Sequence, residues 1–243
     1  MPLRSTDATW GWGSQFFHWA SALAILATAF VGLTMEDVDA LWYYSLHKSL
    51  GMSVLGLVVL RLLWRLVDRR PPYPAGMPAW QRLASSGAHA LIYAAMLVMP
   101  ISGWLYNSAA RRPLDWFGVF KIPSLTALDR ETQTYSVLGF DAPAFIDTPQ
   151  KLRALAGDVH ESLFYAGAVL IALHVAAALK HHFFDRDTTL ARMLPGLASP
   201  AAPASPASAS DAGPSAQPEA ASTAHPTRVS EAGADAAKRT PAP

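Results

Sequence analysis

The chain has 243 residues, of which 51% are hydrophobic and only 15% are charged. Soluble domains carry about 25% charged residues, so this composition favours a membrane protein over a soluble one. The net charge of +1 gives no reason to expect a nucleic-acid partner. Cysteine is absent, which excludes disulfides, thiolate metal sites and covalent c-type haem attachment. Any metal chemistry must therefore use histidine, methionine or carboxylate ligands.

Four apolar segments are each long enough to cross a bilayer, which takes about 20 helical residues. They lie at about 15–35, 45–66, 88–107 and 158–181. Backbone groups in lipid must be hydrogen-bonded internally, so each segment is predicted to be a helix. The first follows Arg4, as a cleaved signal peptide would, but its length and its internal His18 favour a retained helix. The predicted fold is an all-α membrane protein with a four-transmembrane-helix bundle.

The basic residues predict the orientation of the helices. Arginines cluster around the second connection, and Lys180, Arg186 and Arg192 follow the fourth segment, whereas the first connection is acidic. By the positive-inside rule, both termini and the second connection are cytoplasmic. The third connection, about 108–157, is then extracytoplasmic, and we expect it to contain short helical pieces such as Thr148–Leu155.

The last part of the chain, 198–243, is dominated by Ala, Pro and Ser and has almost no large apolar residues. Such a segment buries too little surface to order itself, so a disordered tail is predicted. His225 lies in it and is not expected to be a ligand. The membrane domain is accordingly predicted to span 1–197.

Histidines recur in the apolar segments, where polar side chains are costly and usually face the bundle interior. They are His18, His47, His89, His160 and His174. The last two are 14 residues apart, or almost four helical turns, so they project from one face roughly 21 Å apart along the axis.

The same 14-residue interval occurs in the other segments and sorts these positions into two layers. A cytoplasmic layer is predicted to contain His18, Arg61, His89 and His174. An outer layer is predicted to contain Gly32, His47, Gly103 and His160. Spacing alone leaves open whether His18 or His89 is the partner of His174 in the cytoplasmic layer.

Facing histidines in a bundle core are typical of a haem iron site, and two strong protein ligands favour electron transfer over oxygen binding. Arg61 lies at the level of the cytoplasmic layer, where it could pair with a haem propionate or serve as a positive-inside anchor. Three other readings are open. A His174/His181 site is geometrically allowed, the histidines could serve a divalent-metal transporter, or they could be incidental to a structural scaffold.

Four segments carry a resemblance to the bacterial cytochrome b561 family, which includes the cytochrome b subunits of nickel hydrogenases. They are FFHWASALAIL, YSLHKSLGMSVLGLVVLRLLWRL, HALIYAAMLVMPISGWLY and HESLFYAGAVLIALHVAAALKHHFFDRDTTLARMLP. The resemblance implies four iron ligands and two b haems, with His18 paired to His174 on the cytoplasmic side and His47 to His160 outside. It implies that His89 is not an axial ligand but contacts a propionate, shuttles a proton or helps form a quinone site.

The expected function is that of an inner-membrane di-haem carrier that passes electrons within the respiratory chain. The resemblance implies exchange with the quinone pool and an enzymatic role as a superoxide:quinone oxidoreductase. The alternative within the same class is a haem-bearing anchor subunit of a dehydrogenase or hydrogenase. We expect membrane lipid around the helices, and either a homodimer or a redox partner subunit. The long third connection and the tail depart from the compact family pattern.

Overall fold

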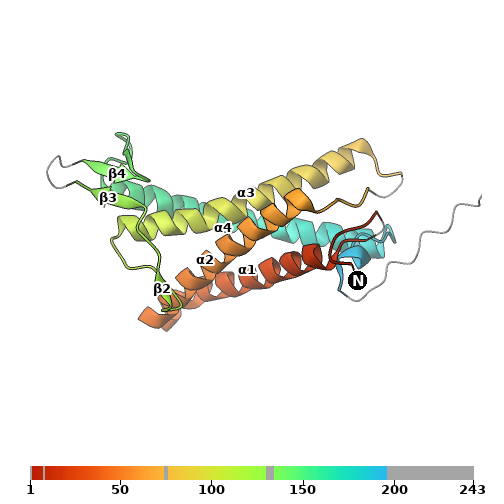
Figure 1. Cartoon of the computed structure of the whole chain (residues 1–243), viewed down its shortest axis with the longest axis horizontal. Helices are drawn as coiled ribbons and strands as arrows, with labels where there is room; N and C mark the ends of the chain where they lie inside the picture. Colours follow the sequence, from red (N-terminus) through yellow and green to blue (C-terminus); the bar gives the residue numbers. More distant parts are fainter. Residues whose placement is uncertain (1, 8, 74–75, 130–133, 196–243) are drawn as a thin grey trace, which may run out of the picture. The chain divides into compact units, whose positions relative to one another are not determined.

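The computed structural model describes residues 2–7, 9–73, 76–129 and 134–195. Four long helices dominate (Figure 1): α1 Trp12–Val38, α2 Leu41–Val67, α3 Ala79–Ala109 and α4 Pro149–Phe183. All four are long and apolar enough to cross a membrane. The predicted four-helix membrane fold is therefore confirmed. The predicted disordered tail, 198–243, lies outside the described residues.

The helices are longer than the apolar segments because hydrophobicity marks only the part that lipid surrounds. α3 begins at Ala79 and α4 at Pro149, each well before the apolar stretch predicted for it. The expected helical piece at Thr148–Leu155 is the start of α4 and not a separate element. Thr148 caps this start, since its side chain accepts a hydrogen bond from the backbone N–H of Lys151, and Pro149 suits the first helical turn.

The third connection contains short strands that the sequence analysis did not predict. β1 (Asp115–Trp116) pairs with β2 (Phe120–Lys121), and a second antiparallel sheet has the order β3 (Thr126–Leu128), β4 (Tyr135–Val137), β5 (Phe140–Asp141). Strands of two or three residues are too short to show a period-two pattern of hydrophobicity. They are stabilised instead by their packing on the helices, β1 on α2 and β3 on α3.

The helices pack as two antiparallel pairs, α1 with α2 and α3 with α4, and α2 also contacts α3. A small core around Val54, Val58 and Met96 joins α1, α2 and α3. A second core around Ala109, Tyr135 and Leu152 holds the three-stranded sheet against the ends of α3 and α4, where Figure 1 shows β3 and β4.

Large apolar side chains on the helix surfaces are widely exposed, as a lipid-facing surface requires. On α1 alone, Leu23, Leu26, Phe30 and Leu33 are each more than 60% exposed. In water such a surface would drive aggregation, whereas in lipid tails it has no such penalty.

Hydrogen bonds tie the segments at the end of the bundle opposite the strands. The chain after α4 returns to the start of α1, where Gln15 and Trp19 donate to the backbone carbonyls of Arg192 and Met193 at 3.1 and 2.9 Å. The described residues near the two termini therefore lie at the same end. The arginines between α2 and α3 are at this end too, which agrees with a cytoplasmic location.

Candidate haem-binding site

The two predicted layers each bring together residues from all four helices. The cytoplasmic layer brings together His18 of α1, Arg61 of α2, His89 of α3 and His174 of α4. In the outer layer, His47 of α2 faces His160 of α4, with Gly32 of α1 and Gly103 of α3 against their rings. The helices thus bring every predicted site residue into one of two clusters.

The outer histidines have the spacing of two ligands on one metal ion. Their ring centroids are 6.2 Å apart and the rings are nearly perpendicular, at 80°. Imidazoles on opposite sides of one ion have centroids about 6 Å apart, because each metal–nitrogen bond is about 2 Å long and the centroid lies about 1 Å behind the nitrogen. The centroid spacing of His47 and His160 is therefore the one expected for two ligands of one iron.

Hydrogen bonds orient both outer rings. The Nδ1 atom of His47 lies 3.1 Å from the carbonyl of Thr28, and that of His160 lies 3.0 Å from the carbonyl of Met99. A carbonyl only accepts, so each Nδ1 carries the proton and donates it. Each Nε2 then keeps a free lone pair, as a metal ligand requires.

Two glycines make space for these rings. A Cβ atom built on Gly32 would lie 2.8 Å from Cε1 of His47, and one on Gly103 would lie 3.2 Å from Cε1 of His160. The first distance is a clash, and the second is closer than ordinary van der Waals contact. Because neither glycine has a side chain, each imidazole can pack directly against the neighbouring helix.

The cytoplasmic layer has three histidines, and their spacing separates the two candidates for a partner of His174. The His18 and His174 ring centroids are 6.2 Å apart, which matches the outer pair. The His89 and His174 centroids are only 5.3 Å apart, and Nδ1 of His89 is bonded to the carbonyl of Ser85 at 2.6 Å. The geometry favours His18 over His89 as the residue opposite His174.

Arg61 is bonded to His18 and does not point freely into the bundle. Its Nη2 atom donates to Nδ1 of His18 at 3.0 Å, and its guanidinium lies 5.3 Å from the centre of the Tyr93 ring. A neutral His18 that accepts at Nδ1 carries its proton on Nε2. Iron binding by Nε2 therefore requires Arg61 to release His18, which a carboxylate partner for Arg61 would allow.

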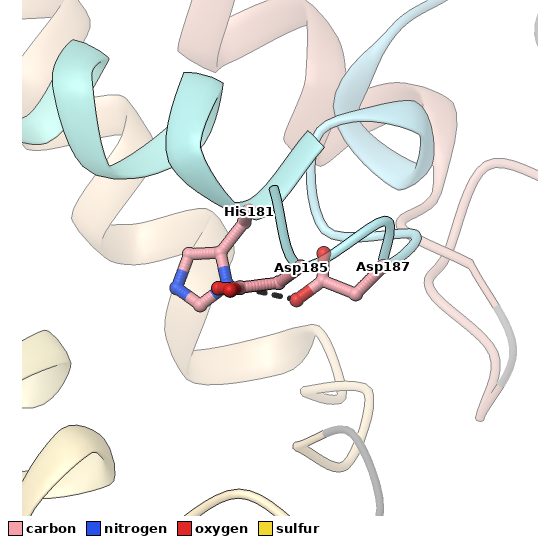
Figure 2. Close-up of side chains that lie close together, drawn as sticks. All are labelled: His181, Asp185 and Asp187. Carbon is pink, nitrogen blue, oxygen red and sulfur yellow. Dashed lines mark ion pairs between the residues drawn. The ribbon is translucent and has the colours of Figure 1, made fainter. Parts of the chain in front are cut away.

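His181 is engaged with carboxylates and not with an opposing helix (Figure 2). Its Nδ1 atom lies 3.0 Å from Asp185 and 2.8 Å from Asp187. Lys180 already binds both Asp185 oxygens, at 2.6 and 2.9 Å, and this hydrogen-bonded ammonium holds the pKa of that carboxyl below its ordinary value. These contacts hold His181 at the end of α4 and disfavour a His174/His181 site.

Comparison with known proteins agrees with this geometry. A family model described as prokaryotic cytochrome b561 matches residues 9–196. The chain belongs to the prokaryotic cytochrome b561 family. It is therefore a multi-pass protein of the bacterial inner membrane that binds b-type haem and takes part in electron transport.

Three curated relatives match most of the membrane domain. Cytochrome b561 homolog 2 of Escherichia coli (strain K12) is 34% identical over 200 residues, which are 80% of this chain and 95% of that protein. Cytochrome b561 homolog 1 of the same organism is 26% identical over 191 residues, 74% of this chain and 93% of that protein. A protein of Yersinia pestis described as a probable superoxide oxidase CybB is 28% identical over 155 residues, 63% of this chain and 76% of that protein.

Some contacts around this cytochrome's histidines were not foreseen from the sequence. Ser102 lies 3.1 Å from Nδ1 of His160 and donates to the Met99 carbonyl that the same ring contacts. Its position beside Gly103, as a hydroxyl in an apolar helix, was the available signal. The Thr28 and Met99 carbonyls had no signal, because every residue carries a carbonyl and only helix packing selects one.

Proposed function

We propose that this cytochrome b561 holds two b haems, one ligated by His47 and His160 and the other by His18 and His174. The observation that carries the proposal is the pair of facing histidines in each layer, both with ring centroids 6.2 Å apart. Bound haem would supply an iron that carries one electron at a time. Because the protein provides two ligands at each site, we propose electron transfer and not oxygen activation.

The surrounding residues would tune these sites. The carbonyls of Thr28 and Met99 hold the outer histidines in the tautomer that keeps Nε2 free. We propose that Arg61 exchanges its bond to His18 for a bond to a haem propionate, which is a charge-assisted pair. His89 would remain beside His174 as a hydrogen-bonded neighbour available for proton transfer.

We propose the quinone pool as the partner, with superoxide as an electron donor at the outer face. The likeness to the protein described as a probable superoxide oxidase favours this donor. One-electron oxidation of superoxide gives oxygen, and two such electrons with two protons reduce a quinone to a quinol. Superoxide-dependent quinone reduction by the reconstituted protein is the assay for this substrate pair.

The rival within the same class is a haem-bearing anchor subunit of a dehydrogenase or hydrogenase. It predicts that a second polypeptide co-purifies with the chain, whereas a free-standing carrier purifies alone or as a homodimer. A histidine-based divalent-metal transporter predicts no intense visible band.

The ligand assignment is tested by counting haem per chain and recording reduced-minus-oxidised spectra. Wild type is expected to hold two haems, while His160→Ala and His174→Ala should each hold one, with a different band remaining in each. His89→Ala is the matched control for His174→Ala, because it removes an imidazole from the cytoplasmic layer without removing a proposed ligand. Full haem content in either ligand variant would refute the assignment. Loss of a haem from His89→Ala but not from His18→Ala would exchange the roles of these two residues.

A further inference from the structure

The β1–β2 hairpin, Asp115–Lys121, is an ordered apolar loop in the third connection. Trp116 pairs with Phe120, and the N–H of Val119 donates to the carbonyl of Trp116 at 2.9 Å, which closes the turn. Phe117 and Gly118 both have positive φ, 49° and 73°, as the two central residues of a type I′ hairpin turn do. The turn therefore directs the residues around Gly118 to the tip.

Hydrogen bonds attach this hairpin to the side of α2. Ser49 is 2% exposed, and its hydroxyl donates to the carbonyl of Asp115 and accepts from the N–H of Phe117, both at 3.0 Å. The indole N–H of Trp116 donates to the hydroxyl of Ser53 at 3.0 Å. One buried serine thus satisfies two backbone groups of the hairpin, which matters most where water is scarce.

The two serines that attach the hairpin lie in the apolar part of α2, a few turns inward from its outer end. Ser49 and Ser53 follow Leu41 by 8 and 12 residues, or about 12 and 18 Å along the axis. α2 has 27 residues, more than the about 20 that cross the hydrocarbon, and its apolar segment is predicted to begin at about 45, so its first turn extends past the membrane core. The hairpin therefore lies beside α2 near the outer membrane boundary.

The tip of the hairpin presents large apolar side chains. Phe117 is 50% exposed, Val119 72% and Phe120 53%, and the Phe120 ring stacks on Trp116. No charged residue stands between Asp115 and Lys121. Leu41 and Trp42, in the first turn of α2, are also exposed, at 88% and 64%. Aromatic residues with lysine at their margin are typical of membrane interfaces.

We infer that the tip of this hairpin inserts into the outer leaflet of the membrane, at the boundary between headgroups and acyl chains. Lipid would cover Phe117, Val119 and Phe120, while Lys121 faces the headgroups. The insertion fixes the third connection against α2, the helix that carries His47. This inference does not depend on which histidines bind haem.

The absence of cysteine from the natural chain allows a direct test. Val119→Cys is labelled with a nitroxide in the full-length protein reconstituted in phosphatidylcholine–phosphatidylglycerol vesicles. Collisions with oxygen, which concentrates in lipid, are then compared with collisions with a water-soluble nickel chelate. Leu26→Cys on the exposed face of α1 is the lipid control, and Ala127→Cys in β3 is the aqueous control. Retention of the b-type spectrum shows that each labelled variant is folded.

An oxygen-to-nickel collision ratio several-fold above that of Ala127→Cys, approaching that of Leu26→Cys, is expected. A ratio equal to that of Ala127→Cys would overturn the inference and leave the tip as a surface for a protein partner. Phe120→Cys provides a second reading if Val119→Cys does not fold, and it must give the same ordering.

Discussion

Gly32 has only a hydrogen atom where other residues have a Cβ, and the position of the candidate ligand His47 depends on this. The ring of His47 occupies the space that a side chain at this position would fill. Gly56, on the exposed face of α2, has no atom within 4 Å of a Cβ built on it. Two glycines in transmembrane helices therefore have opposite sensitivity to the same small change.

We predict that Gly32→Ala displaces the His47 ring and lowers haem content by up to one haem per chain. Gly56→Ala should keep full haem content, and the gain in helix propensity of about 1 kcal/mol should leave the fold unharmed. Haem per chain and the reduced-minus-oxidised spectrum measure both. Equal haem in the two variants would mean that the close contact at Gly32 is not required.

At the scale of elements, the β1–β2 hairpin depends on contacts with α2 more than on its own pairing. An isolated two-stranded hairpin is marginally stable at best. Here Ser49 bonds two backbone groups of the hairpin, whereas the Ser53 hydroxyl accepts from the Trp116 side chain and donates to the Ser49 carbonyl within α2. Replacing each serine in turn therefore tests how strongly its hydrogen bonds hold the third connection on α2.

We predict that Ser49→Ala detaches the hairpin, because it leaves one carbonyl and one N–H without their partner at a cost of about 1–3 kcal/mol. Ser53→Ala should cost less. Trypsin cleavage after Lys121 in reconstituted protein measures the detachment, and it should be several-fold faster for Ser49→Ala. Indistinguishable cleavage of wild type and Ser49→Ala would contradict this role.

At the scale of the whole membrane domain, Asp68 joins the N-terminal segment to the end of α2. Its carboxylate accepts hydrogen bonds from the backbone N–H of Ser5 at 2.8 Å, from the Ser5 hydroxyl at 2.7 Å and from the Ser14 hydroxyl. Burial alone would raise the pKa of Asp68, but the bonds from Ser14 and Ser5 outweigh it and lower the pKa below the ordinary value. The carboxylate form therefore stabilises this end of the domain.

The sign of the pH dependence follows from that lowered pKa. The stabilisation is present above the ordinary aspartate pKa of about 3.9 and is lost as pH falls through the lower folded pKa. We predict that Asp68→Asn lowers stability by about 1 kcal/mol at neutral pH, since the weaker amide acceptor replaces a charged one. The difference from wild type should shrink as pH falls below 4. Thermal unfolding followed by tryptophan fluorescence measures it, and a difference that grows towards low pH would exclude this explanation.

The sequence by itself determined the membrane class, the four helices and the depth of each histidine, because hydropathy and the rise per residue act along the chain. Its spacing could not choose between His18 and His89, since both lie at one depth. Only tertiary structure placed His18 at 6.2 Å from His174, bonded Arg61 to His18 and selected the Thr28 and Met99 carbonyls. It also formed the short strands of the third connection. These features depend on how the helices rotate and pack against one another, and such long-range contacts have no local signal in the sequence.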